Sequence, residues 1–276
     1  MRQIKTLGDL EAASKEEIQE AMERVSIIES LEDYLEWLYQ SETKTIVTSE
    51  LNRYHGRALG IHPSAACKKG QCLLRLYYDC TAEIEPMRAY DPVAQKTWDT
   101  GTLLHDTYQT HFREMFGDQF ADEVKLQNKE LHLKSSADGI FDFENYRAVL
   151  EMKSIKEGSK QFGWEVVQHA PMEDNARQCH FYMALADVPF AIVLYLNKNA
   201  GLIKEHIIRF DFDLWDEIVS EVLEPVIQAA YEGGEKPEGK AGYHCRWCDY
   251  NYACPYVKQA RKNVKGANRP WTRRGR

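Results

Sequence analysis

One stretch of the chain decides the fold, and it runs from Ser136 to Ser154 as SADGIFDFENYRAVLEMKS. The alternation of its residues predicts two strands joined by a turn at Asn145–Tyr146, because side chains alternate between the faces of a strand. Such a hairpin has an apolar face made of Phe141, Phe143, Ala148, Leu150 and Met152. Its other face holds Asp138, Ile140, Asp142, Val149, Glu151 and Lys153. An even-length loop centred on this turn pairs Asp138 with Lys153, beside Glu151.

On the second face, the carboxylates of Asp138 and Glu151 stand beside the ammonium group of Lys153, which is the chemistry of metal-assisted phosphodiester hydrolysis. Carboxylate oxygens of Asp138 and Glu151 can hold Mg²⁺ or Mn²⁺. The metal polarises a phosphate and activates a bound water, while Lys153 can orient that water or offset developing charge. The pattern also fits a half-buried hairpin with a polar outer face, and the hairpin residues alone leave both interpretations open.

Segments around the hairpin predict an α/β fold with a mixed central sheet and helices around it. Apolar spacing predicts a helical region over 14–40 and a helix over 100–116 that ends at Gly117. Strands are expected on both sides of a turn at 127–129. The chain after the hairpin predicts a helix at 175–185, strands at 192–196 and 203–212, and a helix at 214–231 kinked by Pro225.

Composition excludes several classes of protein. The 276 residues are 43% apolar with a net charge of -8, so a disordered chain and a general polyanion binder are both excluded. The last residues, Lys258 to Arg276, carry a charge of +8, either as an arm for phosphates or as a solvated end. No run reaches the roughly 20 apolar residues of a membrane span, and no secretory signal begins the chain. We expect a cytoplasmic protein.

Three of the seven cysteines form a Cys-x2-Cys-x5-Cys pattern at Cys245, Cys248 and Cys254. In a reducing compartment, clustered cysteines bind metal more often than they form disulfides. Four thiolates hold a tetrahedral zinc ion or an iron–sulfur cluster. The candidates for the fourth ligand are Cys67, Cys72, Cys80 and Cys179. Spacing does not separate zinc from iron–sulfur, and unrelated buried thiols are the alternative.

Two helical motifs flank the hairpin. Gly101-Thr-Leu-Leu-His105 places an imidazole where it can join carboxylates around Mn²⁺. Gln178 and Tyr182 are four residues apart and share a helix face, where they can hold a phosphate or a base. Taken singly, each motif also fits an ordinary amphipathic helix.

In this order, the motifs over residues 63–257 resemble the iron–sulfur members of the RecB-like branch of the PD-(D/E)XK nuclease superfamily. That group includes CRISPR-associated RecB-like exonucleases and the nuclease domains of some helicase–nucleases. The segment from Pro63 to Tyr78 looks like the family's opening segment, with Cys72-x-x-Arg75 inside it. The other matches are Gly101-x-x-x-His105, Asp138 with Glu151-x-Lys153, Gln178-x-x-x-Tyr182 and the distal cysteines.

The resemblance implies a restriction-endonuclease-like core at 61–257, after a helical segment at 1–60 and before a basic tail at 258–276. It implies that Mg²⁺ or Mn²⁺ is held by His105, Asp138, Glu151 and the Met152 carbonyl. Lys153 would act on the attacking water, and Gln178 and Tyr182 would position DNA. A [4Fe–4S] cluster, or zinc instead, would be held by Cys72, Cys245, Cys248 and Cys254. Many relatives have glycine three residues before the aspartate, and Gly139 in that role would make Asp142 the ligand.

The activity implied is that of a DNA exonuclease on single strands or duplex ends, in recombination, repair or CRISPR adaptation. A helicase or recombination partner would be a separate protein, because the chain has no nucleotide-binding G-x-x-x-x-G-K-[ST] motif. Two alternatives are a non-catalytic DNA-binding or assembly module on the same fold and a zinc-binding structural protein.

Overall fold

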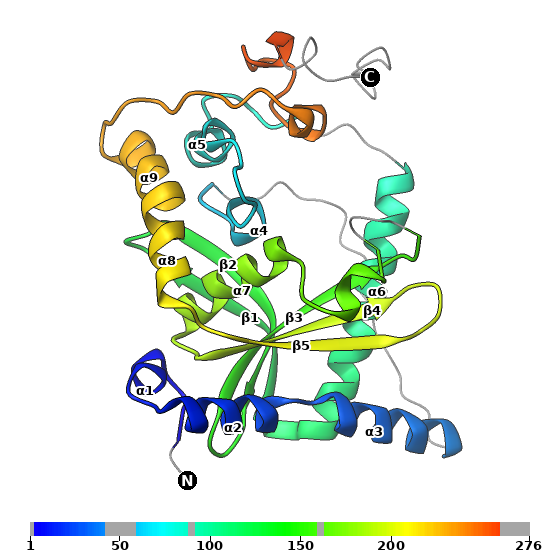
Figure 1. Ribbon diagram of the computed structural model, residues 1–276. Helices are drawn as coiled ribbons and strands as arrows, with labels where there is room; N and C mark the ends of the chain where they lie inside the picture. The colour runs from blue at the N-terminus through cyan, green and yellow to red at the C-terminus, as the bar shows by residue number, and fades with distance from the viewer. Residues whose placement is uncertain (1–2, 42–58, 88–91, 159–162, 260–276) are drawn as a thin grey trace.

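The computed structural model describes residues 3–41, 59–87, 92–158 and 163–259, and their centre is a mixed five-stranded sheet (Figure 1). The strands follow each other in chain order, and only β3 and β4 run parallel. They are β1 (Phe120–Asn128), β2 (Leu133–Asp142), β3 (Arg147–Ile155), β4 (Phe190–Asn197) and β5 (Ile203–Arg209). The predicted α/β class and mixed sheet are therefore confirmed.

The hairpin of β2 and β3 has the predicted faces and a different register. Asp142 pairs with Arg147 and Gly139 pairs with Leu150, so the loop has four residues, 143–146. The predicted two-residue turn at Asn145–Tyr146 and the predicted pairing of Asp138 with Lys153 are therefore wrong. Because the shift is an even number of residues, every side chain stays on its expected face.

One face of the sheet is covered by α6 (Pro92–Phe116) together with α2 (Lys15–Val25). The Phe112 ring of α6 lies edge-on to Phe141 of β2, with centroids 5.6 Å apart. α2 packs on β4 and β5, and its α-helical start is fixed by a capping box at Ser14.

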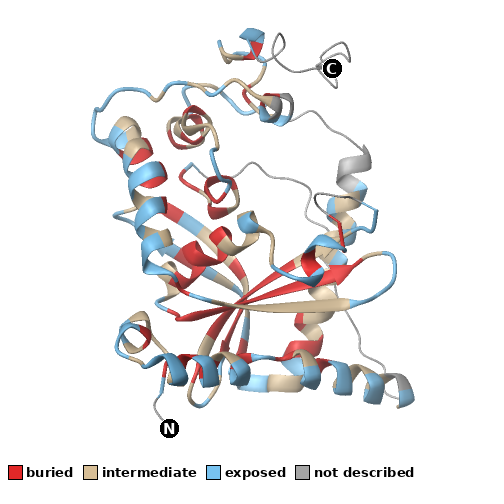
Figure 2. Cartoon of the chain, in the orientation of Figure 1, coloured by how far each residue is buried: buried red, intermediate tan, exposed pale blue. Residues whose placement is uncertain are grey.

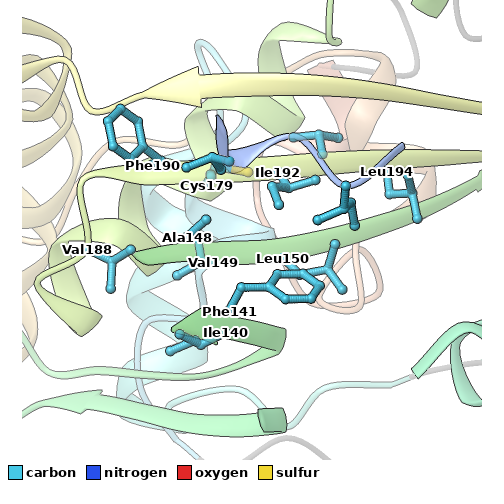
Figure 3. Close-up of a cluster of buried hydrophobic side chains, with 14 of the residues drawn as sticks. Ile140, Phe141, Ala148, Val149, Leu150, Cys179, Val188, Phe190, Ile192 and Leu194 are labelled. Atoms are coloured by element: carbon cyan, nitrogen blue, oxygen red, sulfur yellow. The ribbon is translucent and has the colours of Figure 1, made fainter. Parts of the chain in front are cut away.

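The opposite face is covered by α7 (Glu173–Ala186), which lies against β3 and β4. Asn175 at its start donates to the Tyr195 hydroxyl of β4 at 2.8 Å. With helices on both sides, all of β4 is buried, and red covers the middle of the sheet in Figure 2. Figure 3 shows part of this core, including Phe141, Leu150, Ile192 and Leu194.

A second apolar core joins shorter helices beside the sheet, built on Leu76, Phe181, Ile218 and Leu223. The remaining helices are α1 (Leu7–Glu11), α3 (Ile28–Gln40), α4 (Pro63–Ala66), α5 (Leu73–Thr81), α8 (Phe212–Ile218) and α9 (Glu224–Tyr231). Single helical turns occur at Gly117–Gln119, Val166–Gln168 and Tyr243–Trp247, and the expected kink before Pro225 is a π turn at Val219–Leu223.

Two parts of the expected organisation fall partly outside the described residues. Helices occur at 7–40 of the expected N-terminal segment, whereas 42–58 are not among the described residues. Residues 260–276 of the basic tail also lie outside them. Within the described ranges, no helix combines the length and apolarity needed to cross a bilayer.

Candidate active site

The candidate site lies where β2 and β3 separate. Gly139–Leu150 is the last regular pair between these strands, and β3 then continues beside β4 only. Asp138 comes next on β2, and its Oδ2 accepts a hydrogen bond from the Met152 backbone N–H at 2.6 Å. A side-chain carboxylate thus occupies the position where the backbone ladder stops.

Glu151 and Lys153 of β3 stand on the same face, as their spacing predicts. The Glu151 side chain is only 4% exposed, and its Oε1 contacts the Lys153 ammonium. Lys153 is 32% exposed, so this ion pair runs from the interior of the protein toward solvent. Beneath it on α7 lies the fully buried Cys179, whose thiol pKa is raised by burial and by the Glu151 charge.

α6 completes the cluster from the other side of the opening. His105 Nδ1 lies 3.4 Å from Asp138 Oδ1. One turn later, buried Gln109 donates from Nε2 to the Asp138 carbonyl at 2.8 Å and to Glu123 Oε1 at 3.1 Å. Gly101 of α6 lies beside the end of β3, since a Cβ there would be in ordinary contact with Ser154 Oγ at 3.6 Å.

Burial and charge act in opposite directions on these groups. Burial raises the pKa of Glu151 to about 7, with the Asp138 charge adding to the rise and Lys153 opposing it. Burial also disfavours ionised Asp138, yet the hydrogen bond and charge of His105 hold the pKa of Asp138 below its usual value. Burial lowers the pKa of His105 and Lys153, but the carboxylates raise it by more. The result is a cluster in which the carboxylates of Asp138 and Glu151 face the His105 imidazole and the Lys153 ammonium group.

Gln178 and Tyr182 are brought to this cluster but are not open to solvent. Gln178 Nε2 donates to the Tyr182 hydroxyl, which also bonds Ser135 of β2. Both residues are buried. The shared helix face is as predicted, and the arrangement joins α7 to β2.

Asp142, the alternative metal ligand, lies at the loop end of the hairpin. Lys5 Nζ is 2.8 Å from its Oδ1, and Arg147 Nε is 3.6 Å from its Oδ2. The structure therefore brings Asp138, and not Asp142, beside His105 and Glu151.

The donor set matches the chemistry of a hard divalent cation. It consists of the carboxylates of Asp138 and Glu151, the His105 imidazole and the backbone carbonyl oxygen of Met152. Glu151 is buried at 4% exposure and Asp138 is half-buried at 17%, so a cation between them would offset a desolvation cost. Among the described His, Cys, Asp and Glu side chains, no group of three is arranged around a common metal position.

The four cysteines implied as cluster ligands line one small pocket, although their positions in the chain are far apart. Cys72 at the start of α5 meets Cys245, Cys248 and Cys254 there, next to Tyr78 and Tyr250. The Lys240 N–H donates to Cys72 Sγ at 3.3 Å, which brings the C-terminal segment onto α5. The cavity that they line measures about 10 Å³, which is room for about one water.

The other three cysteines are buried elsewhere. Cys67 and Cys80 belong to the second apolar core, and Cys179 lies under the active-site cluster. Burial raises the pKa of Cys67 and Cys80 to about 11. The structure thus divides the seven cysteines into the same four and three that the resemblance implies.

Sequence reasoning missed Gln109, Glu123 and Ser135. Gln109 follows His105 by four residues, so helical spacing alone could have placed both on one face. Glu123 stands opposite Asp138 on β1 with a backbone φ of +46°, and no local sequence signal indicates that conformation.

No protein-family model matches the chain, and no curated protein matches it. Among solved structures, it is similar to the crystal structure of SSO0001, with 19% identity, a TM-score of 0.45, and coverage of 84% of this chain and 97% of that one. An alkaline exonuclease from Laribacter hongkongensis has 12% identity and a TM-score of 0.46, with 63% and 89% covered. A phage related exonuclease from Haemophilus somnus 129PT has 17% identity and a TM-score of 0.38, with 50% and 74% covered. At such low similarity, the function of this chain has to be inferred from its own residues.

Proposed function

We propose that the protein is a metal-dependent DNA exonuclease with a PD-(D/E)XK-type site. The observation that supports this most is the convergence of His105, Asp138, Glu151 and Lys153 at the opening between β2 and β3. Three of these residues come from the neighbouring strands β2 and β3, and one comes from α6 on the other side of the opening. The set supplies both cation ligands and a positive charge for a phosphate.

His105, Asp138, Glu151 and the Met152 carbonyl would hold Mg²⁺ or Mn²⁺. When bound, the metal supplies Lewis-acid activation of the phosphate and of a water. Lys153 lies two residues after Glu151 on the same face and reaches solvent, so it is placed to orient the attacking water. Gln178 and Tyr182 would act as positioning residues, because their bonds hold α7 against β2 beside Asp138.

We further propose that Cys72, Cys245, Cys248 and Cys254 hold a metal centre, either [4Fe–4S] or zinc. Its role would be structural, because it would connect the start of α5 to a segment about 180 residues later. Anaerobic purification with iron, sulfide and zinc analysis distinguishes the two. Protein without either metal under these conditions would contradict the proposal.

The activity is tested by incubating the protein with 5′- and 3′-labelled DNA, single- and double-stranded, with Mn²⁺, Mg²⁺ or EDTA. An exonuclease releases label as mononucleotides or short oligonucleotides from one end first, and EDTA abolishes the release. Cleavage of closed circular DNA at the same rate would contradict exonuclease action. Undiminished cleavage in EDTA would contradict metal dependence.

A further inference from the structure

Two lysines lie next to each other at the carboxyl ends of the parallel strands. β3 ends at Ile155 and β4 ends at Asn197, and these two residues are partners in the parallel register. The next residues are Lys156 and Lys198, so their backbones are neighbours, and partial burial together with the Lys156 charge lowers the pKa of Lys198. Within the described ranges neither lysine forms an ion pair. The edge of the sheet that carries Lys153 thus continues with two further lysines, beside Glu157, which accepts a hydrogen bond from Asn197 Nδ2 at 3.0 Å.

The first half of α6 lies beside these lysines. Lys198 Nζ is 3.5 Å from the Thr97 carbonyl oxygen, and Figure 1 shows this half of the helix extending past the sheet. The following residue, Trp98, is 51% exposed. An indole with half of its surface in water contributes little to a core, and its exposure has a cost in water. Its position directly after Thr97, whose carbonyl oxygen Lys198 contacts, favours a binding role.

Helical spacing aligns Trp98 with the candidate site. Gly101 and His105 follow it by three and seven residues, so the three positions share one side of α6. That side faces the end of β3, because Gly101 lies against Ser154 and His105 lies against Asp138. Seven helical residues span about 10 Å, or about three nucleotides at the 3.4 Å rise of one DNA strand.

We infer that Trp98, Lys156 and Lys198 form a binding surface for single-stranded nucleic acid, with a base stacked on the indole and phosphates held by the two ammonium groups. Stacking on an aromatic side chain requires an unpaired base, so the surface selects single strands over duplexes. The direction from this surface to His105 and Lys153 rests on the proposed function, whereas the binding itself does not.

The test is fluorescence anisotropy of a labelled oligothymidine with the full chain in EDTA, where no cleavage occurs. Trp98→Ala is expected to raise Kd about fivefold to a hundredfold, and Trp98→Phe to restore most of the affinity. Trp37→Ala is the matched control, since Trp37 is 53% exposed on α3 and is expected to leave Kd unchanged. Lys156→Gln and Lys198→Gln should each reduce the slope of log Kd against log salt by about 0.7.

Three results would overturn the inference or part of it. An unchanged Kd in Trp98→Ala would contradict stacking of a base on Trp98. An unchanged slope of log Kd against log salt in both lysine variants would contradict the phosphate contacts. An equal loss of affinity for a blunt duplex removes the preference for single strands. Failure of nuclease activity is a separate outcome, because wild-type protein that binds through Trp98 without cleaving contradicts only the proposed function.

Discussion

At the scale of single residues, the candidate site depends on how Asp138 is held. Its carboxylate accepts a hydrogen bond from the Met152 N–H, and its backbone carbonyl accepts one from the Gln109 side-chain amide. Gln109 is buried and bonds Glu123 with the same nitrogen. This amide therefore fixes the β2 backbone at the point where the ladder to β3 ends, and it acts through Asp138 without being a ligand itself.

We expect Gln109→Met to weaken Mn²⁺ affinity or activity about 10–100-fold, as loss of such a supporting hydrogen bond does at metal sites. Methionine keeps the length of the side chain and removes both hydrogen bonds. Calorimetric Mn²⁺ titration measures the affinity, and circular dichroism checks the fold. Gln127→Met on the exposed side of β1 is the control. An affinity equal to that of this control would show that Gln109 has no positioning role.

Gly139 is required by its neighbour. A Cβ at this position would overlap the Phe120 ring, which lies in the core on the adjacent strand. Gly139→Ala should therefore lower the free energy of unfolding by about 1–3 kcal/mol.

Gly101→Ala is the contrasting substitution, since its Cβ meets Ser154 at an ordinary distance of 3.6 Å. Removing a glycine from a helix interior should leave stability equal or raise it by up to about 1 kcal/mol. Urea denaturation of both variants measures the difference. Equal stability of the two would show that Phe120 moves aside without cost.

At the scale of elements, α7 holds three parts of the fold together. Arg177 is buried, its Nε donates to the Cys67 carbonyl at 3.1 Å, and its Nη1 is 2.8 Å from Glu217 Oε1 on α8. Gln178 and Tyr182 connect the same helix to β2. The helix that covers the candidate site is thus fixed to α4, α8 and the sheet.

Arg177→Met should lower the free energy of unfolding by about 2–4 kcal/mol, because it leaves a buried carbonyl without its donor and removes a packed side chain. Glu217→Gln should cost about 1 kcal/mol or less, since the Glu217 side chain is 44% exposed. Thermal unfolding of the two variants compares them. A larger loss of unfolding free energy in Glu217→Gln than in Arg177→Met would contradict the greater contribution of the buried Arg177 contacts.

The elements also show how far the sequence predicts this molecule. Side chains alternate along each strand, so every even-length loop places Asp138 and Glu151 on the same face of the hairpin. The two faces could therefore be predicted from Phe141, Leu150 and their neighbours. The register was not, because the four-residue loop 143–146 carries no strong turn signal. α7 is buried on several sides at once from Arg177 to Met183, and therefore its sequence does not reveal which residues face the site.

At the scale of the whole molecule, the cysteine pocket connects distant parts of the chain. Cys72 belongs to the region before the sheet, and its three companions follow the last helices. Apart from these thiols, the two segments are joined by an apolar cluster of Leu74, Tyr78 and Tyr250 and by polar contacts such as that of the Tyr250 hydroxyl with Asp79 at 2.6 Å. A bound metal would add a strong covalent connection between the two segments.

Cys72→Ser and Cys254→Ser are accordingly expected to lose bound metal and to lower Tm by roughly 5 °C or more, which corresponds to about 2 kcal/mol. Cys179→Ser should keep the metal, because Cys179 lies under the active-site cluster. Metal analysis and calorimetry of the purified variants provide the readout. Full metal content in Cys72→Ser would assign the fourth ligand to another residue.

The most direct test of the central claim is the rate of Mn²⁺-dependent nucleotide release by Lys153→Ala and Glu151→Gln, compared with wild type. Lys15→Ala is the control, because Lys15 is exposed at the start of α2, which covers the face of the sheet opposite to α7. The expected result is a loss of at least about 100-fold in both site variants and an unchanged control. Nucleotide release at the wild-type rate by Lys153→Ala and Glu151→Gln would contradict the assignment of nuclease activity to this site.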